Sequence, residues 1–141
     1  MIKIGIVGSR RRDTFHDKAK IFMALHSKLS WLYHKEGVHR CEISIVSGGC
    51  PKGADRFAEE LAEEQELPII IHYPDKSKIN PILNLTNPRL AWAEVAFARN
   101  RKIAEDSDYL IACVSEDRTG GTENTIKHFK ELGKEKNLIL V

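Results

Sequence analysis

The stretch from Ile43 to Glu59, which reads ISIVSGGCPKGADRFAE, most constrains what this chain can fold into. A β-branched apolar run ends at the pair Gly48 and Gly49, and an amphipathic pattern begins after Gly53. This order predicts a buried strand, a turn of accessible backbone and the first turn of a helix. Glycines let a ligand approach the main chain closely, and a helix N-terminus favours an anion, most often phosphate.

The rest of the chain repeats this alternation of apolar strands and amphipathic helices. We expect strands at 2–7, 42–47, 68–72, 109–114 and 138–141, and helices at 15–36, 53–66, 90–106 and 120–132. Continuous apolar strands alternating with helices predict an α/β fold, a Rossmann-like parallel sheet of about five strands in the order 3-2-1-4-5 with helices on both faces. The sequence predicts one domain over 1–141. Residues 73–89, which contain three prolines, are expected to form a long, functional or mobile loop.

Composition excludes several classes of protein. The net charge of +2 is too balanced to indicate a nucleic-acid binder, and no apolar run reaches the roughly 20 residues that span a bilayer. The three cysteines form no CxxC pair, and the six histidines lack metal-ligand spacing. We therefore expect a cytoplasmic protein with reduced thiols, no membrane contact, no metal and no cofactor.

Three glycine turns follow three of the expected strands. In the order 3-2-1-4-5 those strands are neighbours, so the turns meet in one crevice at their carboxyl ends, where open α/β sheets bind ligands. The GxGxxG fingerprint of dinucleotide sites is absent after the first strand. The candidate ligand-binding residues in these turns are Gly8, Ser9, Arg10, Ser47, Gly48, Gly49, Gly53, Gly120, Gly121 and Thr122.

Three further motifs carry a resemblance to a known family. The segments SGGCPKGADRFAE, RNRKIAEDSDYLIA and GGTENTI together resemble the SLOG superfamily of nucleotide-binding Rossmann-like domains, and in particular its small stand-alone YpsA-related branch. The resemblance covers nearly the whole chain. It implies a nucleotide-like ligand and a homodimer that pairs through helices beside the site, for which Trp31 and Trp92 are candidate contacts. The superfamily also contains the Lonely Guy enzymes, which cleave nucleoside 5′-monophosphates.

That resemblance places Arg99 where the Lonely Guy enzymes keep a catalytic arginine. It also suggests Glu123 as a catalytic acid, but the enzymes carry a PGGxGT turn with the acid two or three residues after the threonine. Here Glu123 directly follows Thr122, and one helical step turns a side chain by about 100°. This departure weakens the hydrolase hypothesis and leaves nucleotide binding untouched.

The residues themselves leave alternatives open. Arg99 lies on an apolar stripe, so it needs a partner, which is either a structural aspartate or an anionic ligand. Asn100 and Asp55 could bond a ribose or a base, although Asp55 also stabilises a helix start. Arg11 and Arg12 are expected to be surface charges. We expect a nucleotide-binding sensor or processing protein; an N-glycosidic hydrolase and a single-stranded nucleic-acid binder are the alternatives.

Overall fold

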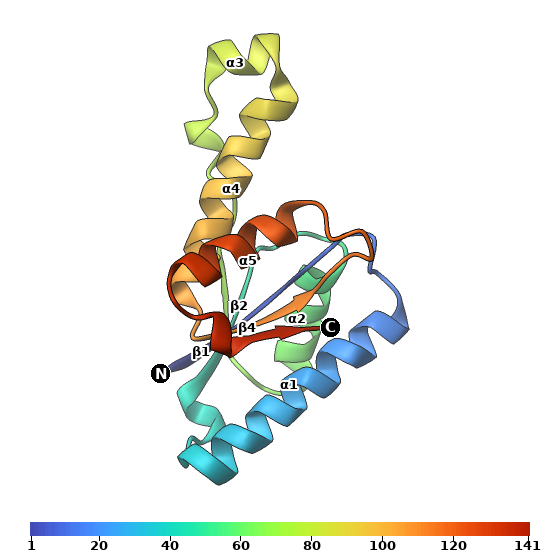
Figure 1. The fold of residues 1–141 in the computed structure, drawn as a ribbon, viewed down its shortest axis with the longest axis vertical. Helices are drawn as coiled ribbons and strands as arrows, with labels where there is room; N and C mark the ends of the chain where they lie inside the picture. Colours follow the sequence, from blue (N-terminus) through green and yellow to red (C-terminus); the bar gives the residue numbers. More distant parts are fainter.

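The computed structural model describes residues 1–141 and contains the predicted α/β architecture (Figure 1). Five parallel strands form one sheet in the order β3-β2-β1-β4-β5. The strands are β1 (Ile2–Gly8), β2 (Ile43–Ser47), β3 (Ile69–Ile71), β4 (Tyr109–Cys113) and β5 (Leu138–Leu140). The main helices are α1 (Phe15–Glu36), α2 (Ala54–Glu64), α4 (Pro88–Asp106) and α5 (Gly121–Glu131). The ends of these elements differ from the predicted ones by at most two residues.

The sheet is covered on both faces, as its apolar strands predict. On one face, Ile4 and Ile6 of β1 and Ile45 of β2 pack with α1 and α2 in the larger core cluster. On the other face, Val7 and Val46 pack with α4 and α5 in the smaller one. Strand order reverses at β1, whose two neighbours are β2 and β4. The carboxyl ends of β1 and β4 therefore flank the point at which open α/β sheets bind ligands.

Helix α1 begins and ends where its sequence signals predict. Thr14 caps it, with the Thr14 hydroxyl accepting from the Asp17 N–H and the Asp17 carboxylate accepting from the Thr14 N–H. Gly37 ends it in the left-handed conformation, with φ of 67°. Its buried side consists of Asp17, Ile21, Leu25, Leu29 and Leu32, whereas Phe15 at its first position is 84% exposed.

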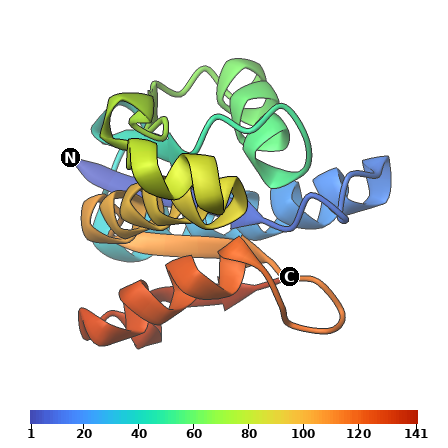
Figure 2. The same ribbon diagram turned by 90° about the horizontal axis from the view of Figure 1, so that it is seen from above.

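The expectation of an irregular loop over 73–89 is wrong. The segment contains a short 3₁₀ turn at Lys76–Lys78 and the helix α3 at Pro81–Thr86, and α4 already begins at Pro88. Together, α3 and the first half of α4 form an arm that projects beyond the sheet (Figure 1) and is seen end-on in Figure 2. Pro81 and Pro88 occupy the first positions of α3 and α4 rather than breaking positions. No helix is long and apolar enough to cross a membrane.

Candidate functional site

A cleft of about 310 Å³ opens at the carboxyl ends of β1 and β4. The turn after β1 forms one wall, α4 another, and the loop leading into α5 the third. This volume lies at the small end of the range for ligand sites. The residues that line the cleft are Val7, Gly8, Ser9, Arg10, Arg11, Cys50, Asp55, Ala96, Phe97, Arg99, Asn100, Ile103, Thr119, Gly120, Gly121, Thr122 and Thr125.

Most of the predicted site residues meet in this cleft, although they come from distant parts of the sequence. The predicted residues that line it are Gly8, Ser9, Arg10, Asp55, Arg99, Asn100, Gly120, Gly121 and Thr122. The predicted residues that do not line it are Ser47, Gly48, Gly49, Gly53 and Glu123. The strand order therefore brings the first and third glycine turns to the cleft, while the glycines of the second turn lie outside its lining and only the neighbouring Cys50 reaches it.

Arg99 lies half-buried in the wall that α4 forms. Its Nη1 donates to the Gly48 carbonyl oxygen at 2.6 Å, and its Nε donates to the Asn100 Oδ1 at 3.0 Å. Burial lowers the pKa of the Arg99 guanidinium, and the nearby Asp55 carboxylate opposes this shift. The Nη2 group makes no hydrogen bond with protein, so it keeps donors for a ligand in the cleft.

Asn100 extends this framework across the cleft. It is buried, and its side-chain nitrogen donates to the Gly121 carbonyl oxygen at 3.2 Å and to Asn124 Oδ1 at 3.3 Å. Together with the Arg99 contact to Gly48, these bonds connect the turn after β2 to the start of α5. The Asn100 amide therefore has a structural role, and contacts within the protein occupy most of its hydrogen-bonding groups.

Asp55 is the one acidic residue among those that line the cleft. It lies in the first turn of α2, is buried, and accepts hydrogen bonds from the backbone N–H of Cys50 and of Gly48. Burial raises the pKa of the Asp55 carboxyl; the Cys50 N–H and Arg99 oppose that shift only in part. A carboxyl with a raised pKa in a cleft is a group that can bond or transfer a proton.

The first turn of α5 forms the third wall. The first N–H groups of any helix have no partner within the helix, and no side chain caps those of α5. Gly120, with φ of 103°, and Gly121 present backbone without side chains at this point, and Thr122 follows them. Uncapped N–H groups and the helix dipole together favour a bound anion here.

The glycines behind the cleft are required by packing within the protein. A Cβ on Gly48 would lie 2.7 Å from the Arg99 Nη1 and 2.9 Å from the Asp55 Oδ2. Gly53 has φ of 72°, and its Cβ would lie 2.8 Å from the Ser9 carbonyl oxygen. These two glycines let the turn after β2 approach α4 and the turn after β1, so they shape the cleft without lining it.

Glu123 faces away from the cleft in this structure. Both its carboxylate oxygens accept from Arg118, at 2.9 Å each. Arg118 has a φ of 55°, which is uncommon for a residue other than glycine. The helical step between Thr122 and Glu123 turns the carboxylate toward the loop before α5 rather than toward the site.

Three consecutive arginines follow Ser9, and the structure gives each a different environment. Arg10 is exposed and lines the cleft without a hydrogen bond or ion pair to the protein. Arg12 is partly buried and was wrongly expected to be a surface charge. It pairs with Asp17 at 2.7 Å and donates to the carbonyl oxygens of Val114 and Val141. Arg12 therefore ties the turn after β1 to the ends of β4 and β5.

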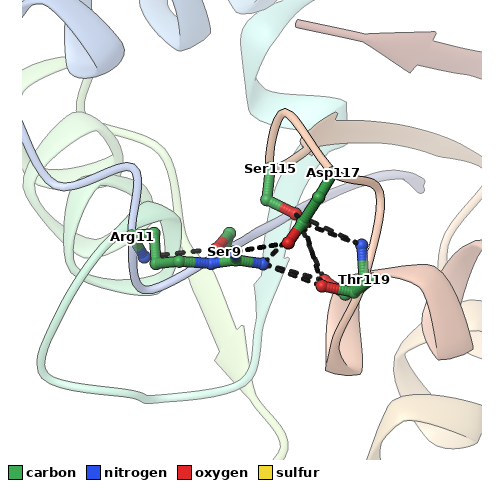
Figure 3. A network of polar contacts seen from close by, with 5 residues as sticks. All are labelled: Ser9, Arg11, Ser115, Asp117 and Thr119. Atoms are coloured by element: carbon green, nitrogen blue, oxygen red, sulfur yellow. Dashed lines mark hydrogen bonds and ion pairs between the residues drawn. The ribbon is translucent and has the colours of Figure 1, made fainter.

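Arg11 is a cleft residue that the sequence analysis missed. It joins the turn after β1 to the loop after β4 through the polar network in Figure 3. Its Nη1 and Nη2 donate to the two oxygens of Asp117 at 2.8 Å each, and Nη2 also donates to the Thr119 Oγ1 at 3.0 Å. The one indication in the sequence that Arg11 could reach the cleft was its position two residues after Ser9 in the same turn.

Comparisons of the chain with protein-family models, with curated proteins and with solved structures found no match. Its His, Cys, Asp and Glu side chains form no cluster of three or more that could hold a metal ion. The polar side chains that line the cleft are three arginines, the Asp55 carboxyl, the Asn100 amide, the Cys50 thiol and the hydroxyls of Ser9, Thr119, Thr122 and Thr125.

Proposed function

We propose that the cleft binds a nucleotide or a nucleotide-derived ligand, and that the protein acts as a sensor or a nucleotide-processing protein. One observation carries the proposal. The uncapped N-terminus of α5 opens into the same cleft as the unpaired Arg10 and the partly free guanidinium of Arg99. Backbone N–H groups beside arginines favour phosphate.

The rest of the cleft supports a ligand larger than phosphate alone. Asp55 offers a carboxyl that can accept a hydrogen bond from a ribose hydroxyl or a base edge. Phe97 and Ile103 add apolar surface on the wall that α4 forms. The resemblance of the motifs to the SLOG superfamily supports the same class of ligand, and we propose that the chain is a member.

A thermal-shift and calorimetric titration with AMP, GMP, cyclic nucleotides, ADP-ribose and NAD tests this proposal. A ligand at 100 times its dissociation constant should stabilise the fold by about 2.7 kcal/mol. Arg10→Gln should weaken binding of the ligand that is found. Lys127→Gln is the matched control, because it removes one exposed positive charge from α5 outside the cleft. No shift and no heat with any compound would refute the proposal.

Asp55 favours a second function, hydrolysis of the N-glycosidic bond of a nucleoside 5′-monophosphate. A carboxyl whose pKa is raised by burial can act as a general acid or base, and Arg99 beside it can stabilise developing negative charge. Glu123 is engaged by Arg118, so Asp55 is the acid that the cleft supplies. Chromatography for free base tests it: release by the wild type and loss in Asp55→Asn would support hydrolysis, and no base above the protein-free control would exclude those substrates.

We also propose that the protein forms a homodimer and is cytoplasmic. Trp31 and Trp92 are 42% and 43% exposed, and the arm exposes further apolar side chains, such as Leu85 at its tip. A helix as short as α3 with no buried residue gains little stability by itself, so burial against a second copy would support the arm. Sedimentation at micromolar concentration as a species of 16.0 kDa would refute the dimer.

A further inference from the structure

The polar network at the mouth of the cleft ties together two loops that line it (Figure 3). Asp117 lies at its centre. Its Oδ1 accepts from Arg11, from the Ser115 hydroxyl at 2.8 Å, and from the N–H and hydroxyl of Thr119 at 3.3 and 2.9 Å. Its Oδ2 accepts from the Arg11 Nη1. Asp117 is thus fixed in one orientation within an otherwise exposed loop.

This arrangement holds an ionised carboxylate against the guanidinium of Arg11. Arg11 and the hydroxyls around it hold the pKa of Asp117 well below its usual range, so the carboxylate is ionised throughout the ordinary pH range. The same contacts occupy both terminal nitrogens of Arg11. Arg11 and Asp117 together add no net charge, which leaves Arg10 and Arg99 as the cations that can meet a ligand.

Asp117 does not itself line the cleft, but it belongs to the loop that leads into α5, and its partners Arg11 and Thr119 do line the cleft. The inner part of the cleft is closed by the buried side chains of Ile103 and Thr125, so a longer anionic chain has to extend toward the mouth. We infer that Asp117 is a specificity-determining residue, which disfavours ligands that carry a second phosphate at the mouth. Asp117 neutralises Arg11, so a second phosphate at the mouth meets the Asp117 carboxylate instead of a free cation. This inference rests on the proposed function.

Asp117→Asn changes the charge and leaves the shape. The amide oxygen can take the place of Oδ1 and keep the contacts to Ser115 and Thr119. The amide nitrogen would then replace Oδ2 and face the Arg11 Nη1, donor against donor, so that the paired contact is lost. The Arg11 Nη2 keeps its contacts to the amide oxygen and to Thr119, while the Nη1 and the uncompensated charge of Arg11 become available to a second phosphate. Glu116→Gln is the matched control, because it removes a negative charge from the adjacent exposed position, which makes no hydrogen bond or ion pair.

The experiment measures the dissociation constants of two ligand pairs, AMP with ADP and GMP with GDP. The proteins are the wild type, Asp117→Asn, Glu116→Gln and a double variant that carries both Arg11→Gln and Asp117→Asn. Wild type should prefer the monophosphate. Asp117→Asn should shift the ratio of the two constants toward the diphosphate by about tenfold, or about 1.4 kcal/mol. Raising the salt concentration should reduce this shift. Glu116→Gln should keep the wild-type ratio, and the double variant should lose the gain.

The possible outcomes separate this inference from the proposed function. Binding of AMP or GMP by Asp117→Asn with an unchanged ratio would overturn the inference and leave the proposed function standing. An equal shift in Glu116→Gln would also overturn it, because the effect would then be general charge. Absence of binding of all four compounds by the folded wild type, shown by its thermal transition, would count against both. A loss of affinity for both members of each pair would show that Asp117 only supports the loop.

Discussion

Replacing Arg99 with alanine tests whether this residue belongs to the site or to the scaffold. Its hydrogen bonds run to the Gly48 carbonyl oxygen and to the Asn100 amide oxygen, not to a carboxylate. Removing hydrogen bonds that involve a charged group costs about 1.5–3 kcal/mol each, or about 3–6 kcal/mol for these two if nothing offsets the loss. Burial lowers the pKa of Arg99, so the charged side chain is itself held at a cost, which its removal recovers.

The net loss in the free energy of unfolding should therefore be about 1–2 kcal/mol, which lowers the melting temperature by roughly 3–6 °C. Urea unfolding at pH 7 measures it. Arg101→Ala is the matched control, because that exposed arginine forms only an i,i+4 pair with Glu105 and should cost under about 0.5 kcal/mol. A loss of about 3–5 kcal/mol in the free energy of unfolding would contradict this prediction, since it would show that Arg99 compensates a buried charge such as Asp55.

Three other changes test the scaffold. The raised pKa of Asp55 stabilises the wild type below the unfolded pKa of about 3.9, and this stability is lost as pH rises through the folded pKa. Asp55→Asn has no such loss, so in urea unfolding its free energy of unfolding should rise relative to that of wild type between pH 4 and pH 7. A difference that stays constant with pH would contradict this. Arg12→Gln breaks a partly buried pair with Asp17 and two carbonyl contacts, and should lower the free energy of unfolding by about 2–4 kcal/mol. Gly53→Ala should cost about 2–3 kcal/mol, since its φ of 72° and a neighbouring carbonyl oxygen exclude a Cβ, whereas Gly37→Ala, in open space, should cost less; equal losses would count against the close approach.

The fold could be predicted because each apolar strand carries its own signal. Continuous runs such as Ile43–Ser47 and Tyr109–Cys113 indicate strands buried on both faces, and the helices between them require parallel crossovers. The arm formed by α3 and the first half of α4 could not be predicted as long as the prolines of residues 73–89 were interpreted as helix breakers. Asn80 before Pro81 and Asn87 before Pro88 are the actual signal, because both asparagines accept from the N–H groups of the helix that follows.

The site was predictable only as far as strand order determines it. Gly8, Gly120 and Arg99 meet because neighbouring parallel strands end at one edge and α4 crosses beside them. Sequence spacing could not show that Glu123 is held by Arg118, since a side chain's direction depends on the partner that it finds in space. For the same reason, spacing could not identify Arg11, whose partner lies 106 residues further along the chain.

A crystal structure of the protein soaked with AMP tests whether the cleft binds a nucleotide. We predict density for the phosphate in the cleft, within hydrogen-bond distance of the N–H groups of Gly121 and Thr122, with Arg10 turned toward it and the sugar near Asp55. Nucleotide bound only outside this cleft, or a cleft that stays empty at saturating concentration, would contradict the account.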